Sequence, residues 1–167
     1  VITYHVPLVR SGKWPTYHMA DFPKMVRRPV LINAARGEVV DNNALLAALD
    51  RGDIRAAVVD TWEGEPRISL SLLDRVFIGT PHIAGYSADG KATGTRMALE
   101  AVARHFGLDV HFDIEPPALP EGLVPAADPF ERMLQLYDPL TDSVRLKAHP
   151  DRFEYLRGNY PLRREHF

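Results

Sequence analysis

Three polar side chains with complementary chemistry stand directly after apolar runs of the chain: Arg36, Glu65 and His82. An arginine stays protonated and can hold a carboxylate through two parallel hydrogen bonds. A histidine titrates near neutrality, so it can accept or return the proton of a hydroxyl group, and a carboxylate can orient its ring and stabilise its charged form. Together these residue types form a workable set for oxidising or reducing a hydroxy acid.

The runs that precede the three residues are typical of short buried β-strands, and they cover residues 30–33, 56–59 and 76–78. In an α/β domain with parallel strands, functional residues gather in the loops after the carboxyl ends of the strands. We therefore expect three residues that are far apart in the sequence to lie at one edge of one sheet.

Helix signals separate these strands. Asp41 is a suitable N-cap for a helix over residues 42–50, and Gly52 supplies the left-handed position that ends it. The longest helix is predicted over 87–106, where apolar residues recur at helical spacing and Gly107 follows. Alternating strands and helices predict the α/β class with a parallel sheet.

The composition narrows the function. The chain has 167 residues, of which 46% are hydrophobic and 25% charged, as in an ordinary globular protein. A net charge of −2 argues against a nucleic-acid or membrane surface, and no apolar run approaches the ~20 residues that span a bilayer. With no cysteine and no pair of histidines at metal-ligand spacing, we expect no disulfide and no metal, and a cytoplasmic location.

The segments around the three residues carry a family resemblance. LINAARGEVVDNNAL contains Arg36, VVDTWEGEP contains Glu65 and GTPHIAGY contains His82. In their residues, their order and their separation, they resemble the corresponding segments of the D-isomer-specific 2-hydroxyacid dehydrogenases. The resemblance covers nearly the whole chain and is densest over residues 1–106. It implies the second half of a Rossmann-type, doubly wound parallel sheet, NAD as cofactor, and hydride transfer from C2 of a 2-hydroxy acid.

The same resemblance implies a role for each site residue. Arg36 would hold the substrate carboxylate, His82 would take the hydroxyl proton, and Glu65 would fix the tautomer of the histidine. Tyr86 would contact the substrate, and the residues that contact the cofactor would be Thr3, Ala34, Arg36, Asp60 and Gly85. Structural interpretations stay open for two of these residues: Asp60 as a cap or turn residue, and Tyr86 as a cover over the cleft.

Features that are less specific than the three motifs indicate a subgroup within the family. The run 62–66, Tyr86 after HIAG, and the tail NYPLRRE most resemble members that act on a phosphorylated hydroxy acid and form homodimers through an additional C-terminal domain. Two other functions remain open at this stage: a different 2-hydroxy acid as substrate, and a non-catalytic module that senses NAD.

Four segments are predicted. Residues 1–86 would be the C-terminal half of an NAD-binding domain, 87–107 a crossover helix, 108–127 a strand with a proline-rich linker, and 128–167 the start of an α+β dimerisation domain. Because Val1 stands inside an apolar run and no GxGxxG is present, we expect a fragment whose phosphate-binding motif lies upstream.

Overall fold

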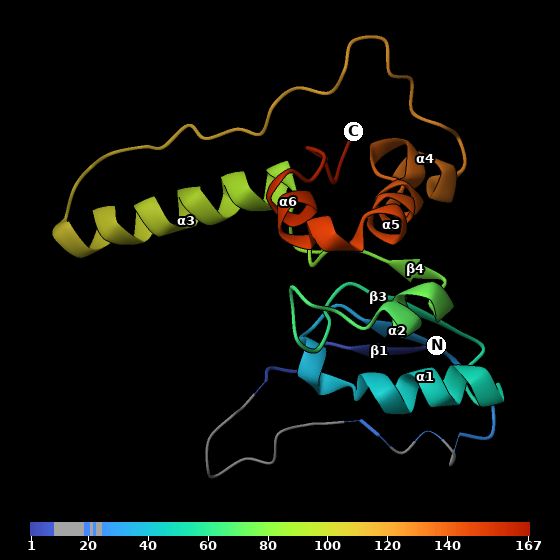
Figure 1. Cartoon of the computed structure of the whole chain (residues 1–167). Coiled ribbons are helices and arrows are strands. Elements are labelled where there is room, and N and C mark those ends of the chain that lie inside the picture. Colours follow the sequence, from blue (N-terminus) through green and yellow to red (C-terminus); the bar gives the residue numbers. More distant parts are fainter. Residues whose placement is uncertain (9–18, 21, 23–24) are drawn as a thin grey trace. The chain divides into compact units, whose positions relative to one another are not determined.

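The structure, a computed structural model that describes residues 1–8, 19–20, 22 and 25–167, contains a four-stranded parallel sheet (Figure 1). The strands follow one another in the order β1-β2-β3-β4, and Leu31 lies beside Ile2 on one side and Ala57 on the other. Their bounds are β1 (Ile2–Tyr4), β2 (Val30–Asn33), β3 (Ala56–Val59) and β4 (Ile78–Gly79). The predicted parallel α/β sheet is confirmed.

Two helices connect the strands as the sequence predicts. The side chain of Asp41 accepts a hydrogen bond from the backbone N–H of Ala44 at the start of α1 (Asn42–Arg51), and Gly52 ends the helix at a φ of 78°. Helix α2 (Leu70–Arg75) begins after Ser69, and a 3-10 turn, η2 (Gly37–Val39), precedes α1. Both predicted ends of α1 are therefore confirmed to within one residue.

The core lies on one face of the sheet. In β2 and β3 every second residue is buried, because successive side chains of a strand point to opposite faces. The buried set joins these strands to the inner faces of α1 and α2, and it includes Leu31, Ala57, Val59, Leu45, Leu49, Leu72 and Leu73.

The edge strand β4 is shorter than predicted and is covered by a helix that the sequence did not reveal. Val76 closes α2, its N–H donating to Leu72, so the strand begins only at Ile78. Helix α5 (Pro139–Ala148) packs against β4, and its side chains bond to the backbone of β4 and of the residue that precedes it by two positions. The Gly79 N–H donates to Ser143 Oγ at 3.0 Å, and Lys147 Nζ donates to the carbonyl of Val76 at 2.7 Å.

The described chain forms two compact units. The first combines residues 1–84 with 139–159, so it holds the sheet, α5, the short 3-10 helix η3 (Pro150–Arg152) and α6 (Phe153–Gly158). The second combines 85–138 with 160–167 and holds α3 (Ala88–Phe106) and α4 (Pro129–Leu136). Compact units are defined by packing alone, and the predicted domain boundaries stay predictions.

In the second unit, the chain's last residues are bound to the start of α3. Arg164 pairs with Asp89 through two nitrogens, at 2.9 and 3.2 Å, and the Glu165 N–H donates to the same carboxylate. The Arg164 guanidinium beside Asp89 holds the pKa of that carboxyl below its usual range. Residues 108–127 contain no β-strand, since their backbone does not pair with any strand of the described chain. The strand predicted there is therefore absent.

Two kinds of feature are missing from the described ranges of the chain. No helix there has the length and apolarity to cross a membrane, and no group of three or more His, Cys, Asp or Glu side chains is arranged to hold a metal ion.

Trp62 connects the loops that follow β2, β3 and β4, and it is only 2% exposed. Its backbone N–H donates to Glu65 Oε1 at 2.7 Å, and its indole N–H donates to the carbonyl of Thr80 at 2.9 Å. Its carbonyl lies so close to Gly37 that a Cβ added there would be 2.0 Å from the oxygen. Its ring lies 2.9 Å from where a Cβ on Gly79 would be.

The contact between Gly37 and Trp62 predicts that Gly37→Ala destabilises the protein. The added methyl group meets backbone atoms that cannot rotate away, so we expect the free energy of unfolding to fall by about 2–4 kcal/mol. Urea unfolding followed by circular dichroism measures this change. Gly94→Ala in α3 is the control, because its Cβ meets nothing within 4 Å. Equal midpoints for the two variants would contradict the prediction.

Candidate active site

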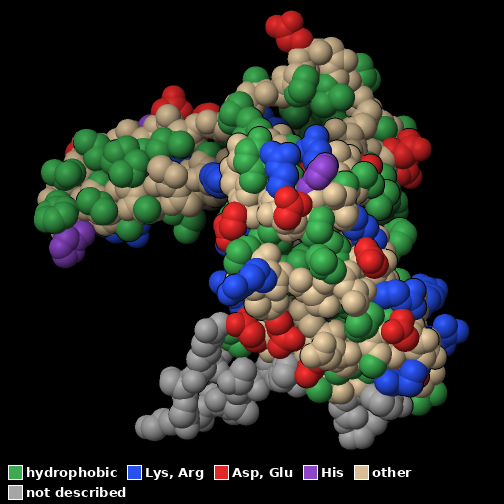
Figure 2. Space-filling model, in the orientation of Figure 1, with side chains coloured by type: hydrophobic (Ala, Val, Ile, Leu, Met, Phe, Trp, Pro, Cys, Tyr) green, Lys and Arg blue, Asp and Glu red, His purple; other side chains and the backbone are tan. Residues whose placement is uncertain are grey.

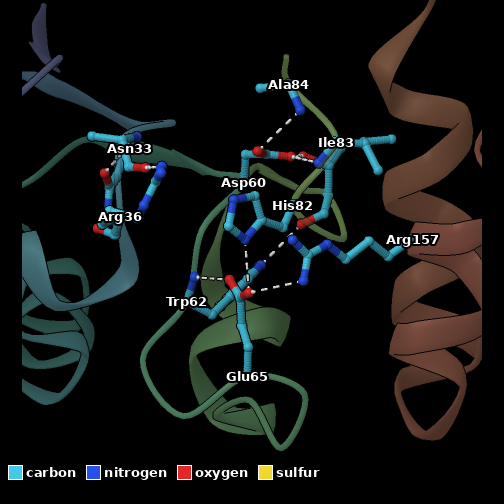
Figure 3. A network of polar contacts seen from close by, with 11 residues as sticks. Asn33, Arg36, Asp60, Trp62, Glu65, His82, Ile83, Ala84 and Arg157 are labelled. Carbon is cyan, nitrogen blue, oxygen red and sulfur yellow. Dashed lines mark hydrogen bonds and ion pairs between the residues drawn. The ribbon is translucent and has the colours of Figure 1, made fainter. Parts of the chain in front are cut away.

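The structure places Arg36, Glu65 and His82 in the loops after β2, β3 and β4, at the carboxyl edge of the sheet (Figure 3). All three belong to the first compact unit. The parallel register of the strands brings the ends of β2 and β3 side by side, with Asn33 paired to Val59. The loops are therefore neighbours although the residues are far apart in the sequence.

Glu65 and His82 form a direct pair. His82 Nδ1 and Glu65 Oε2 lie 2.7 Å apart, and both side chains are partly buried, with 24% and 17% exposed. An ionised carboxylate only accepts hydrogen bonds, so Nδ1 carries the proton, and in the neutral ring Nε2 keeps its lone pair. The backbone N–H of Trp62 donates to the other oxygen of Glu65 and fixes the carboxylate. This pair can accept a proton at Nε2 and stabilise the resulting charge.

The backbone of His82 is held in an uncommon conformation. Its φ is 56°, in the left-handed region that residues other than glycine seldom occupy. Asp60 stabilises this turn. The His82 N–H donates to the Asp60 carbonyl at 2.8 Å, and the Asp60 carboxylate accepts from the N–H groups of Ile83 and Ala84 at 2.8 and 3.0 Å. Residues that the surrounding structure holds in a strained backbone conformation are typical of functional sites.

Asp60 is 4% exposed and accepts a third hydrogen bond, from the hydroxyl of Thr80 to Oδ1 at 2.6 Å. Because Oδ1 accepts two of the three bonds and a carboxylate offers about four acceptor positions, Oδ2 retains room for one more donor. That remaining position is compatible with the predicted cofactor contact, which stays a prediction. The turn role that the sequence left open for Asp60 is therefore observed, although the sequence did not indicate that the turn is the one at His82.

Arg36 is positioned by Asn33, a role that the sequence did not indicate. The buried Asn33 side chain donates to the Arg36 carbonyl at 3.0 Å and accepts from the Ala35 N–H at 3.2 Å, so it closes the turn after β2. The Arg36 guanidinium donates to the Ala35 carbonyl at 2.6 Å and is otherwise exposed. The sequence signal for this role was an asparagine at the end of a predicted strand. It could not indicate the partners of the side chain, because these depend on the geometry of the turn.

An open cavity lies beside Arg36. It measures about 510 Å³, within the range of small-molecule sites, and is lined by residues from the ends of β1 and β2: His5, Val6, Pro7, Leu8, Ala34, Ala35 and Arg36. Of the predicted cofactor residues, Ala34 and Arg36 line this cavity, and Thr3 lies on β1, its hydroxyl 2.9 Å from His5 Nε2.

The other two predicted site residues, Gly85 and Tyr86, belong to the second compact unit. A Cβ added to Gly85 would meet nothing within 4 Å. The Tyr86 ring packs against Tyr160, with ring centroids 4.9 Å apart, and Lys91 Nζ lies 5.0 Å from the Tyr86 centroid. Their predicted roles at the cofactor and the substrate stay predictions.

The chain is similar to curated proteins in sequence and to a solved structure in fold. The chain is 55% identical to a protein of Bacteroides thetaiotaomicron called erythronate-4-phosphate dehydrogenase, and 44% identical to one of that name from Porphyromonas gingivalis. Each match covers 99% of this chain and 48% of the relative, so the chain spans about half the length of the curated relatives it matches.

A solved structure agrees with this likeness. An NAD-complexed D-isomer-specific 2-hydroxyacid dehydrogenase from Lactobacillus delbrueckii superposes with a TM-score of 0.53 at 26% identity, over 65% of this chain and 38% of that one. The family model described as the D-isomer-specific 2-hydroxyacid dehydrogenase NAD-binding domain matches residues 1–84, which include Arg36, Glu65 and His82. The resemblance seen in the sequence is thus confirmed, and the chain belongs to the D-isomer-specific 2-hydroxyacid dehydrogenase family.

Proposed function

We propose that this chain is part of an enzyme that oxidises 4-phospho-D-erythronate to its 2-oxo acid with NAD, a reaction that feeds vitamin B6 synthesis. The observation that carries the proposal is the 2.7 Å contact between Glu65 and His82 at the sheet edge that also bears Arg36. The names of the relatives from Bacteroides thetaiotaomicron and Porphyromonas gingivalis support the choice of substrate.

The three residues divide the work by their chemistry. The guanidinium of Arg36 holds the C1 carboxylate through two hydrogen bonds and polarises the oxygen on C2. Nε2 of His82 takes the hydroxyl proton as C2 is oxidised. Glu65 keeps the ring oriented and stabilises the imidazolium that forms, which requires the short contact to Nδ1.

The cofactor belongs to the same proposal. NAD, when bound, supplies the nicotinamide ring that accepts the hydride. The cavity beside Ala34 and Arg36 has a suitable size, and Asp60 Oδ2 has room for a carboxamide donor. We assign Thr3 and Gly85 to the cofactor as well, and Tyr86 to the substrate.

The proposal includes the homodimer predicted through residues 128–167, and it adds helix α3 as a further contact surface. Helix α3 carries an exposed apolar stripe formed by Leu99, Val102 and Phe106, and Figure 2 shows hydrophobic side chains gathered along this helix. Phe106 is 68% exposed, which is unusual for so large an apolar side chain, and such stripes mark interaction surfaces. A second copy of the chain is the occupant we assign to it.

Turnover of matched substrates tests the proposed reaction. With the complete protein that carries this chain, we expect kcat/KM for 4-phospho-D-erythronate to exceed that for 3-phosphoglycerate by at least about 100-fold, because one carbon and its hydroxyl alter the fit at several contacts. The measurement is NADH formation. For a cofactor that stays bound, a 2-oxo acid is supplied as reoxidant and the phosphorylated 2-oxo acid product is measured instead. Preference for 3-phosphoglycerate would discard the substrate, and NAD binding without turnover of any hydroxy acid would favour a sensing module.

Removal of the proposed base should abolish most of the activity without unfolding the protein. We choose His82→Asn because asparagine tolerates the left-handed backbone that this position requires. We expect kcat to fall by about 10²–10⁴-fold, the usual contribution of general-base catalysis. Steady-state rates at saturating substrate measure the loss, and thermal unfolding checks the fold. A variant that keeps most of its turnover would rule out His82 as the base.

Insertion of a charge into the stripe on α3 tests the homodimer. We expect Phe106→Glu to shift the molar mass measured by light scattering from dimer towards monomer, because a carboxylate is costly to bury without a partner. Ala101→Glu adds the same charge to another side of the helix and should leave the mass unchanged. An unchanged dimer in Phe106→Glu would remove α3 from the interface.

A further inference from the structure

A second arginine lies next to the Glu65–His82 pair. Arg157 Nη1 is 4.0 Å from Glu65 Oε2, the same oxygen that contacts His82. Figure 3 shows Arg157 reaching from its helix towards Glu65, and it shows Arg36 on the opposite side of His82. Arg157 has no part in the proton-transfer set, by which we mean Arg36, Glu65 and His82.

The packing of α6 fixes the position of this arginine. Phe153, at the start of the helix, is 1% exposed, and Leu156 packs against the same core. Because residues 139–159 and residues 1–84 form one compact unit, the place of Arg157 relative to Glu65 and His82 is defined by buried contacts.

The hydrogen-bonding capacity of Arg157 is not used by Glu65. Both oxygens of Glu65 already have short contacts, at 2.7 Å from the Trp62 N–H and 2.7 Å from His82 Nδ1. At 4.0 Å the arginine is near enough for attraction and too far for a hydrogen bond. Among the described residues, Glu65 is its only charged partner, and 32% of its side chain is exposed. Most of its five N–H donors are therefore available to a ligand.

The proposed substrate needs a second cation. Its carboxylate and its phosphate stand at opposite ends of a four-carbon chain, and Arg36 accounts for the carboxylate alone. A guanidinium matches phosphate geometry through two parallel N–H groups, and this makes arginine suited to phosphate recognition. We propose that Arg157 binds the phosphate group of the substrate and so selects phosphorylated over unphosphorylated hydroxy acids. This inference rests on the proposed function.

The segment that carries Arg157 lies outside the general family model and inside the matches to the relatives named for a phosphorylated substrate. The family model covers residues 1–84 and so includes the proton-transfer set without α6. The relatives named for a phosphorylated substrate match 99% of the chain, α6 included. The reaction centre thus belongs to the general part of the family, and Arg157 belongs to the part shared with those relatives.

The test compares two substrates that differ only in the phosphate group, 4-phospho-D-erythronate and D-erythronate, in the complete protein. For Arg157→Gln we expect kcat/KM with the phosphorylated acid to fall by about 10- to 100-fold, mainly through KM, as for the loss of charged hydrogen bonds. The rate with D-erythronate should change by less than about threefold. Arg157→Lys keeps the charge and loses the planar fork. Its kcat/KM with the phosphorylated acid should therefore lie between the values of the wild type and of Arg157→Gln.

Arg152→Gln is the matched control, because it removes the same charge from the adjacent turn, where Arg152 lies over the ring of Tyr155. It should leave the ratio between the two substrates unchanged. Equal losses with both substrates in Arg157→Gln would overturn the inference and show that Arg157 acts through Glu65 and His82. If Arg157→Gln does not fold, an Arg157→Lys variant with an unaltered ratio overturns it instead. A wild-type enzyme that does not prefer the phosphorylated acid overturns the proposed function, and this inference with it.

Discussion

The close contact between Gly37 and the backbone of Trp62 is the constraint on which the site depends. It joins the loop after β2 to the loop after β3, and the indole N–H of Trp62 joins both to the carbonyl of Thr80, before His82. Bonds from Asp60 and Glu65 also join the loop after β3 to the loop of His82, and Trp62 is the buried residue that contacts all three loops. Loops are otherwise the more mobile parts of a fold, so catalysis that needs sub-ångström placement requires such a connection.

The loop of His82 shows how strain and support are combined. A left-handed backbone at a residue other than glycine costs about 1–3 kcal/mol, and the hydrogen bonds from the His82, Ile83 and Ala84 N–H groups to Asp60 offset that cost. The turn aims the ring back towards Glu65, where the short contact at Nδ1 leaves Nε2 for the substrate. Asp60 therefore matters to the proton-transfer geometry whether or not it also contacts the cofactor.

The sequence predicts those parts of the structure that depend on local chemistry or strand order. Asp41 and Gly52 bound α1 as expected because caps are set by a few neighbouring residues. The grouping of the three site loops follows from parallel strands alone. The role of Asn33 was not predicted. For Asp60 a cap or turn role was foreseen without its partners, since the partners of both residues are backbone groups whose positions depend on the turns. The late start of β4 was missed because Val76 is apolar yet serves as the last cap of α2.

The return of residues 139–159 to the sheet was also missed, and it has two consequences. An edge strand exposes backbone donors and acceptors that invite pairing with other chains. Ser143 of α5 satisfies such a group at Gly79, and Lys147 bonds to the carbonyl of Val76 just before the strand. The same packing continues into α6 and sets a guanidinium 4.0 Å from Glu65. Protection of the edge and delivery of a cation to the site are therefore performed by one segment, so the segment cannot be lost without affecting both the stability of the sheet and the charge beside the proposed base.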